Sequence, residues 1–141
     1  CNKNEKDYRF IVMIIGIGQD ICDVTRISKT INRFGNRFKH RIYTDNEIIK
    51  CESRYNSVDS YARRFAAKEA CSKALGTGFR KGVFYKDIEV LNLPSGKPSI
   101  KLKGGALNQY RLITNNKIEA SINVSLTDDK KLALAIVIIS C

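Results

Sequence analysis

Residues 61–82 read Y-A-R-R-F-A-A-K-E-A-C-S-K-A-L-G-T-G-F-R-K-G. Alanine at five of these positions, with leucine, arginine and lysine between them, makes this the strongest helix-forming stretch of the chain. Gly76 predicts the end of the helix, because glycine takes the left-handed conformation of a helix C-terminus without a Cβ penalty. We expect the rest of the chain to be organised around this helix.

A carboxylate and an ammonium group lie one turn apart on this helix. At 3.6 residues per turn, Glu69 and Lys73 share one face. The ordinary role of such a pair is a solvent-exposed i,i+4 ion pair that stabilises the helix. Two features favour a functional role instead. Many neighbouring positions are small, so another element can approach closely, and the helix runs directly into the loop G-T-G-F-R-K-G at residues 76–82.

The loop combines three glycines with two cations, and exposed backbone N–H groups and positive charge both suit phosphate oxygens. It is not a P-loop, because the glycines follow the helix instead of opening it and no G-K-[ST] is present. The loop by itself therefore indicates only an affinity for phosphate groups.

Composition limits the remaining possibilities. A chain of 141 residues with 43% hydrophobic residues is typical of one globular domain with a real core. A formal charge of +11 indicates a polyanionic partner: nucleic acid, a membrane surface, an acidic protein or a phosphorylated substrate. No apolar stretch approaches the roughly 18 residues that span a bilayer, so no membrane-spanning segment is expected.

Cysteine and histidine usage excludes several kinds of site. The five cysteines are widely spaced without a C-x-x-C pair, which indicates neither a zinc site nor a disulfide framework. His40 is the only histidine and stands between Lys39 and Arg41, which argues against a Ser/His/Asp triad. Carboxylates are therefore left for acid–base or metal chemistry.

The N-terminal part of the chain predicts a strand that ends in a carboxylate. We exclude residues 1–12 from the core, as the remnant of a longer precursor or a cloning boundary, and place the domain at residues 13–141. Residues 13–21, M-I-I-G-I-G-Q-D-I, alternate isoleucine with glycine, which predicts a strand that another element approaches closely on its glycine side. Asp20 would ordinarily be a turn or cap residue. Since Asp23 can cap the next helix, Asp20 is available for a site.

A helix predicted at Val24–Phe34 carries an apolar stripe, Ile27 and Ile31, and a basic face. That face consists of Arg26, Lys29 and Arg33, with Arg37 just beyond. Such a face is most often simply solvated. Its position directly after Asp20 makes a docking surface the alternative.

The remaining pattern predicts an α+β fold. Thr44 and Glu47 form a capping box that starts a helix through about Arg54, and residues 57–60 are expected to separate it from the central helix. A hairpin (88–93 and 99–102, with a turn at 94–98), a short helix (106–114) and strands at 118–126 and 132–139 follow. Helices thus fill the first half and an antiparallel-rich sheet the second, without regular βαβ alternation.

These pieces resemble the holo-acyl-carrier-protein synthases, the short bacterial-type 4′-phosphopantetheinyl transferases, over residues 13–140. The family's G-I-G-x-D-I stands at residues 16–21, its F-A-x-K-E-A-x-x-K-A-x-G-T-G at 65–78, and its G-K-P turn at 96–98. Its late H-V-S-[IL]-[ST]-[HD] stands at 123–128, with Asn123 in place of the histidine. Any role of that imidazole is therefore absent or taken by an amide.

The resemblance implies a 4′-phosphopantetheinyl transferase-like fold and an enzyme of fatty acid biosynthesis. Its activity would be to move the 4′-phosphopantetheine arm from coenzyme A to a serine of acyl carrier protein, with release of adenosine 3′,5′-bisphosphate. The implied catalytic residues are Asp20, Glu69, Lys73 and Asp128. Asp20 and Glu69 would hold Mg²⁺, which needs only one or two carboxylates beside phosphate oxygens and water, and Lys73 would contact the pyrophosphate. Glu69, Asp128 and a metal-bound water remain alternatives for deprotonating the serine.

The resemblance also implies the partners. The residues expected to contact coenzyme A are Arg64, Lys73, Gly76, Thr77, Gly78, Lys97 and Pro98. Arg26, Arg33 and Arg37 would dock the acidic acyl carrier protein through charge complementarity. A homotrimer with active sites between subunits is expected, in the cytoplasm if the chain is bacterial, or in a plastid-like organelle if residues 1–12 are the remnant of a transit peptide.

Two other function classes compete with this one. A small nucleic-acid-binding protein would also carry a charge of +11, but no RRM, KH or zinc signature is present, and Asp20 and Glu69 would lie poorly beside phosphates without a metal. A catalytically inactive trimeric scaffold is disfavoured because Asp20, Glu69 and Lys73 are all intact.

Overall fold

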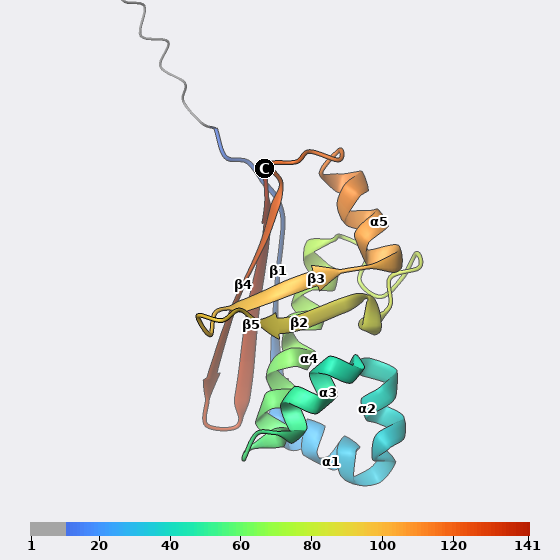
Figure 1. Cartoon of the computed structure of the whole chain (residues 1–141), viewed down its shortest axis with the longest axis vertical. Helices are drawn as coiled ribbons and strands as arrows, with labels where there is room; N and C mark the ends of the chain where they lie inside the picture. The colour runs from blue at the N-terminus through green and yellow to red at the C-terminus, as the bar shows by residue number, and fades with distance from the viewer. Residues whose placement is uncertain (1–10) are drawn as a thin grey trace, which may run out of the picture.

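The computed structural model describes residues 11–141, so the predicted leader at residues 1–12 lies almost wholly outside the described residues. The elements follow one another as β1 (Ile14–Asp23), α1 (Val24–Phe34), α2 (Asn36–Ile42), α3 (Asp45–Glu52), α4 (Ser57–Ala74), the 3₁₀ helix η1 (Tyr85–Asp87), β2 (Ile88–Asn92), β3 (Pro98–Leu102), α5 (Gly104–Ile113), β4 (Ser121–Asp129) and β5 (Leu132–Ser140) (Figure 1). The predicted α+β class is confirmed.

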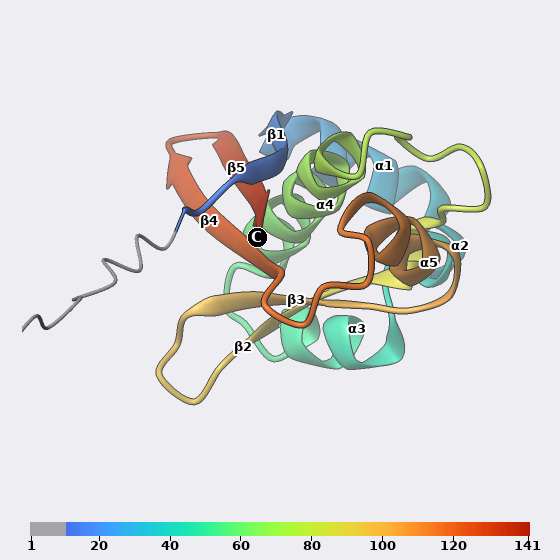
Figure 2. The same cartoon turned by 90° about the horizontal axis from the view of Figure 1, so that it is seen from above.

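The strands form two antiparallel sheets around the central helix. One has three strands in the order β1-β5-β4, and the other is the β2–β3 hairpin that the sequence predicted. Figure 2 shows α4 along one face of the three-stranded sheet, with the hairpin crossing beside it. Because side chains alternate between faces, β5 turns Ala133, Ala135, Val137 and Ile139 towards α4, and all four are buried.

The glycines of β1 permit α4 to approach the sheet, as the alternating pattern predicted. A Cβ atom at Gly18 would lie 1.9 Å from the backbone oxygen of Ala70, and one at Gly16 would lie 2.0 Å from that of Ala74. Any larger residue would collide with the helix backbone. This crossing sets the distance between the end of β1 and the C-terminal half of α4.

The central helix is longer than predicted. Residues 57–60 do not separate it from α3; they form its first turn, and the N–H of Ser60 donates to the oxygen of Asn56 at 3.2 Å. The prediction was wrong because this polar stretch was read as a linker, whereas Ser60 is only 1% exposed. At the other end Gly76 has a φ of +84°, consistent with the predicted glycine stop.

Three smaller differences concern the other elements. Helix α3 ends at Glu52 instead of about Arg54, and β4 spans Ser121–Asp129 instead of residues 118–126. Helix α2 was not predicted, because its seven residues carry little apolar periodicity and gain their helical structure from packing, with Ile42 buried. Both predicted N-caps are confirmed: Thr25 N donates to Asp23 Oδ1 at 2.8 Å, and Thr44 and Glu47 form the capping box.

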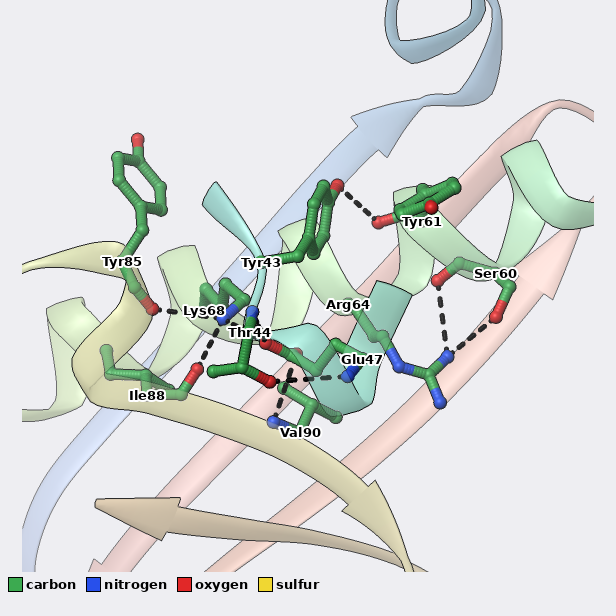
Figure 3. A network of polar contacts seen from close by, with 10 residues as sticks. All are labelled: Tyr43, Thr44, Glu47, Ser60, Tyr61, Arg64, Lys68, Tyr85, Ile88 and Val90. Carbon is green, nitrogen blue, oxygen red and sulfur yellow. Dashed lines mark hydrogen bonds and ion pairs between the residues drawn. The ribbon is translucent and has the colours of Figure 1, made fainter. Parts of the chain in front are cut away.

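A buried ion pair joins α3 to the central helix α4 and, through further hydrogen bonds, to η1 and β2. Lys68 Nζ lies 2.7 Å from Glu47 Oε1, and the two side chains are 0% and 1% exposed. The same ammonium donates to the backbone oxygens of Tyr85 and Ile88, while Glu47 Oε2 accepts from Val90 N at 3.1 Å (Figure 3). Burial lowers the pKa of Lys68, and the neighbouring Glu47 carboxylate opposes that shift. The sequence assigned Glu47 only to a capping box and missed this network.

Among residues 11–141, no helix is long and apolar enough to cross a membrane.

Candidate active site

Asp20 and Lys73 meet where β1 crosses α4. Lys73 Nζ lies 3.1 Å from Asp20 Oδ1 and donates to the backbone oxygen of Gln19 at 2.9 Å. The Asp20 side chain is 18% exposed and that of Lys73 is 52% exposed, so the pair opens to solvent on the lysine side. Within the part of the chain that the structure describes, the ion-pair partner of Lys73 is Asp20 and not Glu69. The interpretation of Glu69 and Lys73 as a simple i,i+4 pair is therefore wrong.

Glu69 forms its side-chain hydrogen bond with Tyr85 and not with Lys73. Its Oε1 accepts a hydrogen bond from the hydroxyl of Tyr85 at 2.8 Å. Burial of Tyr85, and then the hydrogen bond to Glu69, raise the pKa of this hydroxyl well above its ordinary value, so it remains a donor at neutral pH. Tyr85 was missed by the sequence analysis, since no periodicity or motif singles out a tyrosine of the short η1 helix.

Both predicted metal ligands line one cavity of about 290 Å³. Asp20 and Glu69 contribute carboxylates, and Arg26, Phe38 and Phe65 are among the other lining residues. No group of three or more histidine, cysteine or acidic residues suited to a metal occurs among residues 11–141. Two carboxylates suit Mg²⁺, which completes its octahedral shell with phosphate oxygens and water, whereas a structural zinc site would require four protein ligands.

Cys22 borders the same cavity without adding a ligand. Burial, and then the negative charge of Asp20, raise the pKa of its thiol to about 11. The thiol therefore stays protonated at neutral pH, whereas cysteine binds metals as a thiolate. The atoms that this cavity offers to a metal are therefore the carboxylate oxygens of Asp20 and Glu69.

A second cavity of about 570 Å³ lies on the other side of the β1 edge. Asp20 and Lys73 line it together with Ser125, Thr127 and Leu134 from the outer face of the sheet. Asp20 therefore borders both cavities, and the site is accessible from two sides of one strand.

The residues predicted to contact coenzyme A fall into two groups. Arg64 is 6% exposed, donates to Ser60 Oγ at 2.6 Å and to Asn92 Oδ1 at 3.3 Å, and lines a small pocket with Pro98. Its Nε has no hydrogen-bond partner among residues 11–141. The loop beginning at Gly76 lies at the opposite end of α4, about 18 Å away at 1.5 Å per residue. The Asp20–Lys73 pair lies nearer the loop that begins at Gly76 than the pocket of Arg64 and Pro98.

Asp128 does not join the other predicted catalytic residues within one chain. It pairs with Ala133 on β5, which in turn pairs with Cys22 on β1, so β5 separates Asp128 from the strand of Asp20. Two strand spacings amount to about 10 Å, far beyond a hydrogen bond. Asp128 Oδ2 instead lies 3.8 Å from Arg63 Nη1. Asn123 is exposed on the outer sheet face.

The predicted docking arginines are exposed on α1 and α2. Arg26 also lines the cavity of Asp20 and Glu69, and Arg33 lies 5.1 Å from the centroid of the Phe34 ring. None of Arg26, Arg33 and Arg37 forms an ion pair with an acidic residue of the described chain. Their charge is available to a partner.

The sequence profile described as the 4′-phosphopantetheinyl transferase superfamily (ACPS) matches residues 16–137. The chain belongs to this superfamily. The match begins at Gly16 and covers β1, α4 and the strands of the main sheet, so it includes every element of the site described above.

Individual phosphopantetheinyl transferases agree with this assignment. A holo-[acyl-carrier-protein] synthase of Methylobacterium nodulans is 54% identical over 127 residues, which are 90% of this chain and 96% of the relative. The crystal structure of the synthase from Neisseria meningitidis has a TM-score of 0.79 and 34% identity over 90% of this chain and 98% of that one. The Helicobacter pylori synthase, solved in complex with coenzyme A, has a TM-score of 0.72 and 31% identity over 87% and 98% of the two chains. The predicted enzyme class and fold are confirmed.

Proposed function

We propose that the protein transfers the 4′-phosphopantetheine arm of coenzyme A to a serine of apo-acyl carrier protein, in a Mg²⁺-dependent reaction that serves fatty acid biosynthesis. The products are holo-acyl carrier protein and adenosine 3′,5′-bisphosphate. The observation that carries the proposal is the convergence of Asp20, Glu69 and Lys73, from two elements, on two cavities that share Asp20. The similarity to relatives named holo-[acyl-carrier-protein] synthase supports the same substrates.

The chemistry requires charge neutralisation at a pyrophosphate. Attack of the serine hydroxyl on phosphorus builds negative charge on the non-bridging and leaving oxygens. When bound, Mg²⁺ would supply Lewis-acid stabilisation of that charge. Asp20 and Glu69 would hold it, and the Lys73 ammonium, already fixed at the edge of the site by Asp20 and Gln19, would neutralise a further oxygen.

Coenzyme A is long enough to span both groups of predicted contacts. We place the 3′-phosphate of its adenosine near Arg64 and Pro98, with Lys97 exposed on the adjoining hairpin turn. The unpartnered Nε of Arg64 supports an anion at this end, because a buried guanidinium N–H without an acceptor is costly. The loop of Gly76, Thr77 and Gly78 would lie close to the pyrophosphate, beside the Asp20–Lys73 pair.

We further propose a homotrimer with active sites between subunits. Ile17 and Ile21 are each 58% exposed on the outer face of the three-stranded sheet, beside the half-buried Leu134, Ile136 and Ile138. Such an apolar face is typical of a surface that another copy covers. A neighbouring subunit on this face would adjoin the larger cavity beside Asp20 and Lys73, to which β4 contributes the outward-facing Ser125 and Thr127.

The acyl carrier protein would dock on the exposed arginines of α1 and α2. Arg26 lies at the rim of the carboxylate cavity, and Arg33 and Arg37 extend the positive surface away from it. An acidic helical partner on this surface would bring its serine towards Asp20 and Glu69 by electrostatic complementarity.

The decisive experiment is to incubate the full chain with coenzyme A, Mg²⁺ and apo-acyl carrier protein and to weigh the carrier protein by mass spectrometry. We expect a mass gain of one phosphopantetheine arm, and no gain when EDTA is present from the start of the incubation. Asp20→Asn and Glu69→Gln should each remove most of the activity while the melting temperature changes little. No transfer by the wild-type chain, together with salt-dependent binding to DNA or RNA, would favour the nucleic-acid-binding alternative instead.

A further inference from the structure

The carboxylate of Glu69, one of the two predicted metal ligands, is restrained by a side chain of another element. The hydroxyl of Tyr85, 16 residues later, donates to its Oε1 at 2.8 Å. No hydrogen bond to Glu69 Oε2 is formed by another side chain or backbone N–H of residues 11–141. One oxygen of this carboxylate is thus engaged by the protein, and the other is left for the cavity.

The position of Tyr85 is itself fixed on several sides. Its ring stacks on those of Phe79 and Phe65, with centroid separations of 3.7 Å and 5.8 Å and interplanar angles near 20°. Its backbone oxygen accepts from Lys68 Nζ at 3.0 Å. Figure 3 shows this carbonyl directed at Lys68 while the ring and hydroxyl point away from the buried network. A rigid support therefore runs from the Glu47–Lys68 pair to the hydroxyl that holds Glu69.

We propose that Tyr85 is a positioning residue that orients Glu69 for a divalent cation. The proposal rests on the function proposed above, in which Asp20 and Glu69 hold Mg²⁺. A free glutamate side chain rotates about three bonds and loses that freedom when it binds a metal; a hydrogen bond that orders it beforehand reduces the loss. With Oε1 engaged by Tyr85, Glu69 presents a single oxygen, the monodentate mode that the small octahedral shell of Mg²⁺ favours.

The alternative is that Tyr85 only fills space between Phe65 and Phe79. Tyr85→Phe separates the two roles, because it keeps the ring and its stacking and removes only the hydroxyl. Tyr55→Phe is the matched control, since Tyr55 is fully exposed and its hydroxyl makes no hydrogen bond within the described chain. Both variants are made in the full chain.

The first readout is direct binding of Mn²⁺, used in place of Mg²⁺ and followed by the loss of the free-ion EPR signal. We expect Tyr85→Phe to weaken Mn²⁺ binding roughly 10-fold, where the effects typical of one lost hydrogen bond and of a lost metal-supporting contact overlap. The second readout is transfer: the Mg²⁺ concentration for half-maximal activity should rise by a similar factor, excess Mg²⁺ should restore turnover, and the KM for acyl carrier protein should stay unchanged. Tyr55→Phe should match the wild type in both.

The possible results distinguish a failure of the role proposed for Tyr85 from a failure of the proposed metal site. Mn²⁺ binding and Mg²⁺ requirement that are unchanged in Tyr85→Phe but impaired in Glu69→Gln would overturn the role of Tyr85 and leave the metal site intact. Binding unchanged in Glu69→Gln as well would overturn the proposed metal site itself. A loss of turnover in Tyr85→Phe that excess Mg²⁺ does not restore, with normal Mn²⁺ binding, would also contradict the positioning role.

Discussion

Lys73 and Asp20 are 53 residues apart in the sequence, and their charged atoms lie 3.1 Å apart where α4 crosses β1. The lysine thus links two elements instead of stabilising its own helix through Glu69. Because Lys73 is half exposed, solvent screens this pair and its contribution to stability should be small. The geometry therefore favours a role in binding or catalysis.

Lys73→Ala separates stability from function. We expect the free energy of unfolding to fall by less than about 1 kcal/mol, as for a solvent-screened ion pair. Turnover should fall by a factor on the order of 10²–10³, by analogy with the loss of one preorganised donor at a developing charge. Turnover and urea denaturation measured on the same preparations provide the test.

Lys73→Arg is the control for charge alone. It should recover only part of the turnover, because a planar guanidinium does not replace a compact ammonium in a fitted site. Near-normal turnover in Lys73→Ala would remove Lys73 from the active site.

The basic surface of α1 can be tested by charge reversal. Arg26→Glu combined with Arg33→Glu should raise the KM for acyl carrier protein on the order of tenfold or more, since both steering and surface pairing are reversed. The KM for coenzyme A should change much less. Initial-rate kinetics with each substrate varied in turn measure the two effects.

Arg111→Glu combined with Lys117→Glu makes the same change in net charge on exposed residues. Arg111 belongs to α5, which lies at the opposite end of the molecule from α1 (Figure 1). If this control raises the KM for carrier protein as much as the α1 variant does, net charge alone is responsible and the docking surface is refuted.

The buried Glu47–Lys68 pair should be costly to break. Lys68→Met leaves the Glu47 carboxylate buried without its counter-ion, which typically costs about 3–5 kcal/mol. Urea denaturation should show this loss, whereas Lys101→Met, at an exposed position of β3, should stay within about 0.5 kcal/mol. A loss below about 1 kcal/mol in Lys68→Met would mean that the pair contributes little to holding α3, α4 and β2 together.

Gly18→Ala tests the close crossing of β1 and α4. The added Cβ would meet the backbone oxygen of Ala70 at 1.9 Å, so the strand or the helix must shift, at a cost of about 2–3 kcal/mol. The shift should also separate Asp20 from Lys73 and lower turnover in the protein that remains folded. Gly96→Ala, at a φ of +88° in open space, should cost about 1 kcal/mol through backbone strain alone. Equal losses in the two variants would contradict the crossing as the cause.

Helix propensity, turn residues and capping residues were enough to predict most helices and strands from the sequence. The alanine-rich run predicted α4, the P-S-G-K-P turn predicted the β2–β3 hairpin, and the caps of α1 and α3 were identified from Asp23, Thr44 and Glu47. The alternation of glycine in β1 even predicted that another element packs closely against it. In the helices, caps and hairpin the interacting groups lie close together in the sequence, so their spacing specifies the contact, whereas the glycines of β1 indicated a close approach without identifying α4 as the partner.

Only the tertiary structure decided which groups meet across the site. The sequence placed Glu69 and Lys73 together, but Lys73 bonds to Asp20 and Glu69 to Tyr85. It gave Glu47 a local role and could not assign Lys68 as its partner. Residues this far apart are joined by the angle and distance at which helices and strands cross, and by the exclusion of water from between them. The hydrophobic period of a single helix or strand reveals neither the crossing geometry nor the exclusion of water, because both depend on how whole elements pack.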